Sequence, residues 1–291
     1  MSLTSPVSTS PRAVTQVLRG MPASDGAGVK LTRVIGQPRL PDLDPFLLLD
    51  EFGTDKAEDY IAGFPEHPHR GFETVTYMLA GAMRHQDHAG NEGDLVAGSV
   101  QWMTAGRGII HSEMPRQQDG LMWGFQLWIN LPARDKMTAP RYQDIPPDRI
   151  PEATLAPGVR ARVIAGDAGG VHGPVEGIAT APLYLDVRMD PRSRASLSLT
   201  KGHSAFVYVY DGRASLGGPD GAREVARGQA AVLGDGDTLE VATADEPARF
   251  LVLAARPLRE PVARYGPFVM NTREELAQAA EDYQRGTFLR T

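Results

Sequence analysis

The chain has 291 residues, of which 42% are hydrophobic and 23% charged, the proportions of a globular protein with a sizeable core. Its 30 basic and 36 acidic residues give a net charge of −6, and no block of Lys or Arg suits direct nucleic-acid binding. The absence of cysteine excludes disulfides and thiolate metal sites. Residues 1–14 lack an apolar segment of signal-peptide length, and no apolar run approaches the roughly 20 residues of a membrane span. We therefore expect a cytoplasmic protein without membrane contact.

Short β-rich runs separated by glycine and proline follow one another along most of the chain. In the first of them, ETVTYML, side chains that suit the two faces of a sheet alternate with a period of two. Many short strands with glycine-marked turns predict an all-β sandwich or barrel. The main predicted strands are 73–79, 182–189, 205–210, 230–233 and 250–254.

Two pairs of possible metal ligands are the most specific feature of the sequence. His67 and His69 form one pair, and His111 and Glu113, which follow a Gly-Arg-Gly segment, form the other. Residues i and i+2 share a face of a β-strand, so each pair would direct both side chains the same way. Two such strands facing each other would bring three imidazoles and one carboxylate to one divalent metal ion.

The composition changes at a proline-rich segment, 132–157, which is predicted to be a linker containing one strand. We accordingly expect two domains, 1–140 and 141–291. Aligning Gly81 with Gly212 places Ser198 and Thr200 at the positions of the paired histidines, and Ser204 at that of Glu73. Neither hydroxyl side chains nor His203, which lies one residue out of phase, would replace the ligands. The second domain is therefore expected to have the same fold without a metal.

The end of the chain carries the one clear signal for a helix. Thr272 can cap it, and Glu275, three residues later, completes a capping box. Leu276, Ala280 and Tyr283 form an apolar stripe that predicts packing on a sheet, and Gly286 suits the end of the helix.

Four stretches of the sequence resemble the pirin family of bicupins: HPHRGFETVTYML, GDLVAGSVQWMTAGRGIIHSEMP, GFQLWINLP and EPVARYGPFVMNTREEL. The resemblance extends from about Leu47 to the C-terminus. It implies two cupin barrels (double-stranded β-helices, or jelly rolls) in tandem, with a C-terminal helix in the second domain. It also implies a single metal ion, usually iron, in the N-terminal cupin.

Carried over by motif, the ligands implied by the family are His67, His69, His111 and Glu113. Glu73 occupies a ligand position of germin-like cupins but not of this family, so we expect a buried, hydrogen-bonded strand residue there. Imidazole and carboxylate suit Fe(II), and also Ni, Cu, Mn, Co or Zn. Four protein ligands on an octahedral ion leave room for water, substrate or O2. Glu113 is also the predicted catalytic residue, as a ligand that takes the proton of an enol.

The family resemblance implies an iron-dependent oxidoreductase of the quercetin 2,3-dioxygenase type, which cleaves a flavonol or similar aromatic enol with O2. A different class competes: a metal-binding regulator that contacts transcription factors or metabolic enzymes through its surface. A wide, aromatic-lined pocket at the metal favours the enzyme, and a sealed metal favours the regulator. A metal-dependent isomerase would have the same ligands but has no supporting motif. We expect a monomer.

Other residues near these motifs have ordinary interpretations. His85, His88 and His172 are expected to be solvated loop residues. Arg70 and Arg107 adjoin the ligand pairs and could receive an anionic substrate, form salt bridges or bind carbonyl groups. Five side chains on neighbouring strands are expected to form core, with one or two lining the entrance to the metal: Trp102, Met103, Trp123, Phe125 and Trp128.

Overall fold

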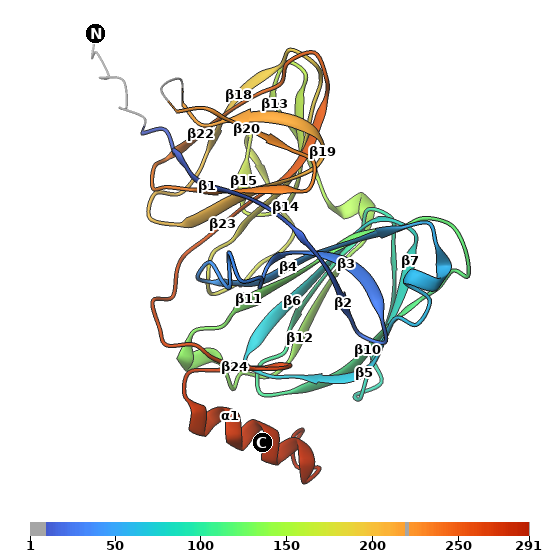
Figure 1. Ribbon diagram of the computed structural model, residues 1–291. Coiled ribbons are helices and arrows are strands. Elements are labelled where there is room, and N and C mark those ends of the chain that lie inside the picture. Colours follow the sequence, from blue (N-terminus) through green and yellow to red (C-terminus); the bar gives the residue numbers. More distant parts are fainter. Residues whose placement is uncertain (1–9, 219–220, 291) are drawn as a thin grey trace. The chain divides into compact units, whose positions relative to one another are not determined.

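The computed structural model describes residues 10–218 and 221–290, a part of the chain that contains many β-strands and one α-helix (Figure 1). Residues 1–9, most of the N-terminal stretch inspected for a signal peptide, lie outside the described residues. No helix within the described ranges combines the length and the hydropathy needed to cross a membrane. The predicted all-β class with a C-terminal helix is confirmed.

Two compact units divide the chain, and we call them the first and the second barrel. The first barrel consists of residues 20–150, 174–180 and 258–290, and the second consists of residues 10–19, 151–173 and 181–257. The expected division at residue 140 therefore differs from the structure, most clearly in placing the C-terminal helix in the second domain. The reason is that the end of the chain returns to pack on the first barrel.

Eleven strands of the first barrel form two sheets that face each other. The strands are β2 (Met21–Asp25), β3 (Val29–Ile35), β4 (Phe46–Thr54), β5 (Phe64–His69), β6 (Phe72–Ala80), β7 (Ala82–Asp87), β8 (Glu92–Val96), β9 (Val100–Thr104), β10 (Ile109–Pro115), β11 (Met122–Asn130) and β12 (Arg141–Ile145). The larger sheet has the order β12-β9-β6-β11-β4-β3-β2 and the smaller has the order β5-β10-β7-β8. The strand predicted at 73–79 is confirmed by β6, which is buried along most of its length.

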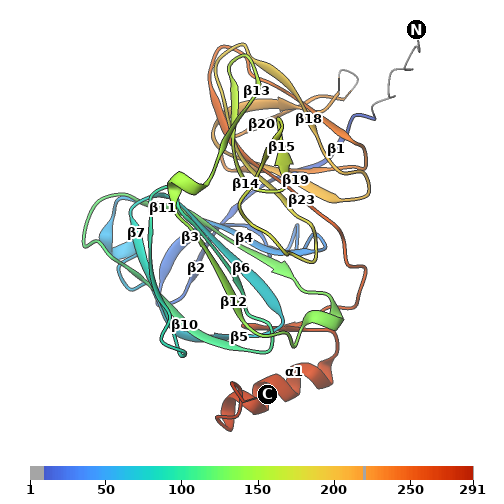
Figure 2. The same ribbon diagram turned by 180° about the vertical axis from the view of Figure 1, so that it is seen from behind.

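The C-terminal part of the first barrel comprises β24 (Ala263–Tyr265), β25 (Phe268–Met270) and α1 (Arg273–Gln284). Both views place α1 at the end of the barrel where β5 and β24 lie (Figure 1, Figure 2). The predicted capping box is confirmed: the hydroxyl of Thr272 accepts from the Glu275 backbone, and the Glu275 carboxylate accepts from the backbone of Thr272. Leu276 and Ala280 pack against a cluster formed by Phe268, Ala279 and Phe288.

Two buried cations tie this C-terminal part to the rest of the first barrel. Arg70 forms a 2.7 Å ion pair with Asp282 of α1 and donates to the carbonyl of Phe288. Lys136, only 2% exposed, donates to the carbonyls of Gly71 and Val269 and to the side chain of Asn130. Both contacts explain why the helix belongs to this barrel although the second barrel intervenes in the sequence.

The second barrel contains twelve strands in the described residues, ten of them in one large sheet. They are β1 (Val14–Arg19), β13 (Glu152–Ala156), β14 (Val159–Ala165), β15 (Asp167–Ala168), β16 (Val171–His172), β17 (Leu183–Met189), β18 (Arg194–Ser198), β19 (Ser204–Leu216), β20 (Arg223–Ala226), β21 (Gln229–Leu233), β22 (Thr238–Ala242) and β23 (Ala248–Ala255). The predicted strands at 182–189, 205–210, 230–233 and 250–254 are confirmed.

Segment 132–157, predicted to be a linker with one strand, contains two strands, β12 and β13, and two short 3-10 helices (Ala133–Asp135 and Pro147–Arg149). A third 3-10 helix, Ala57–Asp59, precedes β5. The strand β12 pairs with β9 of the first barrel, and β13 pairs with β14 of the second. The passage between the barrels therefore lies at about residue 150.

The alignment of the two barrels on Gly81 and Gly212 is wrong by one residue at β18. Ser198 and Thr200 are exposed, whereas Leu197 and Leu199 are buried in the apolar cluster of the second barrel. The side chains that face inward at β18 are therefore one residue away from those given by the glycine alignment. A shift of one residue reverses the faces of a strand, and this accounts for the error.

Candidate metal centre

The two predicted ligand pairs lie on neighbouring antiparallel strands of the smaller sheet. His67 and His69 are on β5, His111 is on β10, and the register places His111 directly opposite His67. Gly71 follows β5 with φ of +89°, and a Cβ there would overlap the carbonyl oxygen of Val269. A glycine at this turn is therefore what lets the chain leave the histidine pair and return as β6.

The three histidines converge on one point inside the first barrel. One nitrogen from each of His67, His69 and His111 lies within 4.8 Å of the corresponding nitrogens of the other two. The Nε2 atoms of His67 and His69 are 3.0 Å apart, and all three ring centroids lie within 5.0 Å of one another. His69 and His111 are 3% and 1% exposed. The structure therefore brings together the three imidazoles that the sequence singled out.

The protonation of the cluster suits a cation. Burial lowers the pKa of His69 and of His111 well below the ordinary imidazole value, and nearby imidazoles lower it further. Neutral imidazole is the form that binds metals. Nδ1 of His67 lies 2.8 Å from the carbonyl of Pro65 and donates to it, which leaves its Nε2 lone pair directed at the cluster. Nε2 of His111 is buried without a partner among the described residues. A divalent metal fits this donor set.

Glu113 lies near the histidines but is not one of the residues whose ligand atoms meet in the cluster. It is buried on β10, and its Oε1 accepts a 2.8 Å hydrogen bond from the hydroxyl of Thr76 on β6. The same hydroxyl lies 2.8 Å from the side-chain amide of Gln126, which is paired with Thr76 across β6 and β11. The hydrogen bond from Thr76 thus holds the carboxylate of Glu113, a residue of the smaller sheet, against the larger sheet.

Glu73 is a buried, hydrogen-bonded strand residue, as predicted. It is 2% exposed, and its carboxylate accepts a 2.7 Å hydrogen bond from the hydroxyl of Thr104. Successive residues of β6 point to opposite faces, so Glu73 lies on the face away from Thr76 and Glu113. Burial raises the pKa of Glu73 to about 7, although the hydrogen bond from Thr104 works against the shift.

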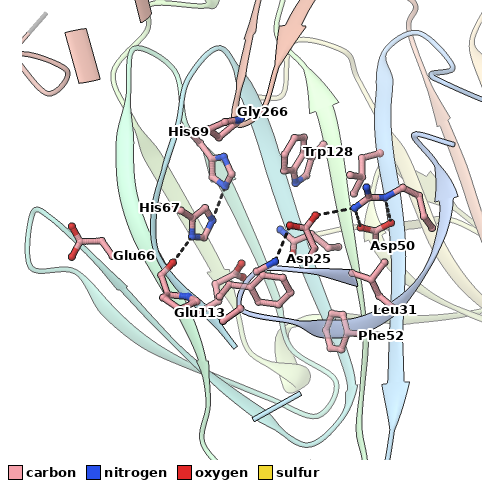
Figure 3. Close-up of a pocket in the computed structure, with 18 of the residues that line it drawn as sticks. Asp25, Leu31, Asp50, Phe52, Glu66, His67, His69, Glu113, Trp128 and Gly266 are labelled. Atoms are coloured by element: carbon pink, nitrogen blue, oxygen red, sulfur yellow. Dashed lines mark hydrogen bonds and ion pairs between the residues drawn. The ribbon is translucent and has the colours of Figure 1, made fainter. Parts of the chain in front are cut away.

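A pocket of about 590 Å³ opens onto the histidine cluster from within the first barrel. Figure 3 shows His67, His69 and Glu113 on one side and Leu31, Asp50 and Phe52 on the other. Trp128 borders the pocket beside His69, at a ring-centroid distance of 5.3 Å. Of the five side chains expected to form core with one or two lining the entrance, Trp128 lines the pocket, and Trp102, Met103 and Phe125 are buried in the core.

The family models match both halves of the chain: "Pirin" matches residues 28–129, and "Pirin C-terminal cupin domain" matches residues 184–289. The chain belongs to the pirin family.

Relatives of this pirin-family protein cover nearly the whole chain. A Pseudomonas aeruginosa protein, whose name gives quercetin 2,3-dioxygenase as a provisional activity, is 51% identical over 94% of this chain and 97% of its own length. Pirin of Homo sapiens is 43% identical over 94% of this chain and 93% of its own. The crystal structure of a quercetin 2,3-dioxygenase from Acinetobacter baumannii matches with a TM-score of 0.87 and 32% identity, over 96% of this chain and 99% of the other. These matches agree with the tandem-cupin fold.

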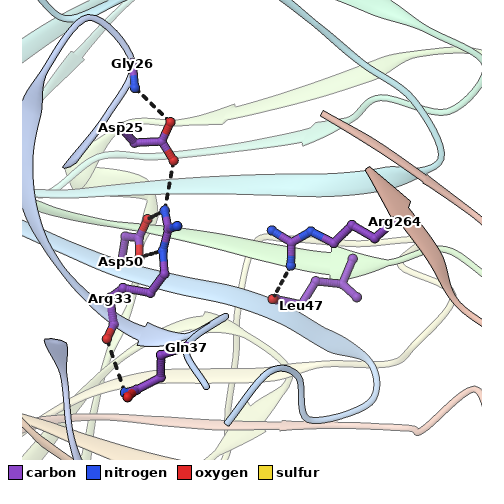
Figure 4. Close-up of polar contacts among 7 residues, drawn as sticks. All are labelled: Asp25, Gly26, Arg33, Gln37, Leu47, Asp50 and Arg264. Atoms are coloured by element: carbon purple, nitrogen blue, oxygen red, sulfur yellow. Dashed lines mark hydrogen bonds and ion pairs between the residues drawn. The ribbon is translucent and has the colours of Figure 1, made fainter. Parts of the chain in front are cut away.

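An ion-pair network in this pirin-family pocket was not identified from the sequence. Arg33 contacts Asp50 through two hydrogen bonds of 3.0 and 2.7 Å and Asp25 through one of 2.8 Å (Figure 4). The hydrogen bonding to Asp50 raises the pKa of Arg33, so the guanidinium stays charged. Arg264, whose guanidinium stacks over Trp128 at 5.0 Å, donates to the carbonyl of Leu47. Asp25, Arg33 and Asp50 lie on the consecutive strands β2, β3 and β4, whose register places Arg33 opposite Asp50, whereas Arg264 comes from β24 near the end of the chain.

The structure also overturns the sequence interpretation of His85. It was expected in a solvated loop but lies on β7 at 2% exposure, because its side chain packs against His111 of β10 and Tyr142 of β12. His88 and His172 are exposed, as predicted. Arg70 has the salt-bridge and carbonyl-binding role, whereas Arg107 is exposed.

Proposed function

We propose that this pirin-family protein is an iron-dependent oxidoreductase that cleaves a flavonol, or a similar planar enol, with O2 in a quercetin 2,3-dioxygenase reaction. The observation that carries the proposal is the 590 Å³ pocket that reaches His67 and His69. A metal serving only as a structural element would be closed by its protein ligands. The relatives named as quercetin 2,3-dioxygenases support the same reaction.

In this proposal, His67, His69, His111 and Glu113 hold the metal as Fe(II). Bound iron would supply redox chemistry toward O2 and a positive charge for an enolate oxygen. The buried, neutral imidazoles are ready to coordinate without first losing a proton. Other divalent metals share this ligand preference, so the identity of the metal is itself part of the proposal.

The pocket walls would hold a planar substrate and exclude water. Leu31, Phe52, Phe64 and Trp128 provide apolar surfaces of the kind that bury an aromatic ligand. Because these side chains border the same cavity as the histidines, a substrate packed among them would present its polar edge to the metal site. Exclusion of water would strengthen the electrostatic contacts made there.

Glu113 would take the proton of the substrate hydroxyl on its carboxylate. A hydroxyl carries one proton, so if Thr76 donates it to Glu113 Oε1, the remaining contact requires Gln126 to present its amide N–H to Thr76. This chain of two hydrogen bonds would position the carboxylate at the pocket wall. The reaction would then add both atoms of O2 to the flavonol, break two carbon–carbon bonds of its central ring and release carbon monoxide, and Glu113 would return the proton to the carboxylate of the product.

Anaerobic reconstitution with Fe(II), followed by measurement of O2 uptake and carbon monoxide release with quercetin, tests the proposal. We expect equal consumption of quercetin and O2 and a loss of turnover in Glu113→Gln. Reconstitution with Zn(II) should keep flavonol binding but abolish O2 uptake, because zinc has no redox chemistry. If saturating flavonol leaves the iron spectrum unchanged, the proposed reaction is wrong and a regulatory role through protein contacts becomes the better reading of the same site.

A further inference from the structure

His85 makes a direct contact with one of the three clustered histidines. The Nδ1 atoms of His85 and His111 are 3.3 Å apart, and the ring centroids are separated by 5.1 Å. Both side chains are almost completely buried, at 2% and 1% exposure. The ring of Tyr142 contacts His85 edge to face at 4.8 Å and restricts its orientation. His85 is thus a polar residue placed behind a metal-binding residue, on the side opposite the free Nε2 of His111.

Proton counting restricts what this contact can be. A neutral imidazole carries one N–H, so in a contact between two Nδ1 atoms one ring must donate and the other must accept. If His85 donated, the single proton of His111 would be on its Nε2, the nitrogen that has no partner among the described residues. That nitrogen could not then bind a metal. Only donation from His111 to His85 leaves Nε2 of His111 open.

We propose that His85 is a positioning residue for the metal centre: its Nδ1 accepts the Nδ1–H of His111 and thereby holds His111 in the tautomer whose Nε2 can bind a metal. The proposal rests on the metal site of the proposed function but not on the reaction with O2. It also assigns His85 its own tautomer, with the proton on Nε2. A partner of this kind, behind a ligating histidine, fixes ring orientation and raises the basicity of the ligand.

A histidine that merely fills the barrel would behave differently on substitution. In His85→Phe, a ring of similar size can keep the contact with Tyr142, but the Nδ1–H of His111 loses its acceptor. In His85→Gln, a side-chain carbonyl can again accept that hydrogen bond, although the ring is lost. If His85 only fills space, His85→Phe should weaken zinc binding less than His85→Gln does. If His85 positions His111, His85→Gln should weaken zinc binding less than His85→Phe does. His88→Phe, in an exposed position of the same hairpin, is the matched control.

The test uses the full chain loaded with Zn(II), whose affinity is measured by competition with a chelator. We expect His85→Phe to weaken zinc binding by about 10–100-fold, the usual effect of losing a partner behind a ligand. His85→Gln should recover most of the affinity, and His88→Phe should match the wild type. Comparable zinc affinity in wild type and His85→Phe, or a weaker effect for Phe than for Gln, would overturn the proposal.

Tautomers can be read directly in the wild-type protein, without any variant. Long-range ¹H–¹⁵N spectra of the zinc-loaded chain with ¹⁵N-labelled histidine should show His111 protonated at Nδ1 and His85 protonated at Nε2. A proton on Nδ1 of His85, or a wild-type chain that does not bind zinc, contradicts the inference. Zinc is redox-inactive, so these tests do not depend on the reaction with O2. A protein that passes them but consumes no O2 when loaded with Fe(II) would contradict the dioxygenase reaction and leave the role of His85 intact.

Discussion

The two barrels share a strand arrangement but differ at the positions that matter for metal binding. In the first barrel, β5 pairs with β10 and His67 lies opposite His111. In the second, β18 pairs with β22 in the same way and Leu197 lies opposite Leu239. Leu199, two residues after Leu197, corresponds to His69. Three histidines of one barrel are thus matched by three leucines of the other.

The two barrels use their interiors differently: the second is filled with apolar side chains, and the first encloses a pocket. Leucines 197, 199 and 239 belong to a continuous apolar cluster in the second barrel. In the first barrel, Leu31 and Phe52, which belong to one apolar cluster, instead border a pocket of about 590 Å³. A barrel that leaves space for a ligand loses the apolar contacts that would fill that space. The first barrel also has buried polar contacts to its C-terminal segment, such as those of Arg70 with Asp282 and of Lys136 with Val269.

The comparison is tested most severely by removing a histidine from the cluster. We expect His69→Ala to lower the metal content of the purified protein from about one per chain to nearly none, because the ion loses a ligand held at 3% exposure. Elemental analysis measures this content. His203→Ala, in the second barrel, is the control and should retain the metal. Metal retained by His69→Ala, or two metals per wild-type chain, would show that the barrels do not differ as described.

Matched leucine truncations should reveal the unequal packing of the two barrels. We expect Leu239→Ala, at 0% exposure, to cost about 3–5 kcal/mol, because it opens a cavity in a filled core. Leu31→Ala, beside the pocket, should cost about 2 kcal/mol, since one side of Leu31 already borders open space. Hydrogen exchange, which resolves the two barrels, measures both losses. Equal losses would argue that the pocket does not weaken the packing of the first barrel.

Glu73 provides a smaller and pH-dependent effect confined to the first barrel. Its pKa rises from 4.5 to about 7 on folding, so the folded state binds its proton more tightly. Stability from this group is complete below pH 4.5 and is lost as the pH rises to about 7. Glu73→Gln should therefore stabilise the protein by about 3 kcal/mol well above pH 7 and hardly at all below pH 4.5.

Denaturation curves at several pH values check this sign, and metal analysis supplies the control. Glu73→Gln should keep most of its metal, because Glu73 lies on the face of β6 away from the histidines. A variant that loses the metal as completely as His69→Ala would place Glu73 among the ligands.

The smallest predicted effect concerns the assignment of α1 to the first barrel. Thr272→Ala removes the hydroxyl that accepts from Glu275 and should cost about 1 kcal/mol. Faster hydrogen exchange is expected in α1 and the strands of the first barrel. The same change spread over β17 and β23 would contradict the division into units.

Sequence reasoning succeeded where the signal is local. Alternation within single strands, the Thr272–Glu275 capping box and the two ligand pairs each depend on residues a few positions apart, and the structure contains the strands, the box and the three clustered histidines. The assignment of Glu113 as a ligand stays a prediction.

Sequence reasoning failed where long-range strand pairing and packing determine the position of a residue. His85 is buried because its side chain packs against His111 of β10 and Tyr142 of β12, and the inward face of β18 is set by its register with β22. The return of α1 to the first barrel depends on contacts such as that of Arg70 with Asp282, more than two hundred residues apart. A single sequence carries no direct signal for such pairings.

Lys136 has a consequence for how the protein is made. Its ammonium group holds the carbonyl of Gly71, next to the histidine strand, and that of Val269, near the end of the chain. During synthesis, residues 20–150 leave the ribosome long before Val269 does, and most of the second barrel, residues 151–173 and 181–257, is translated in between. The first barrel, most of which is translated before the bulk of the second, is therefore completed last, and the enclosure around its histidines waits for the final residues of translation.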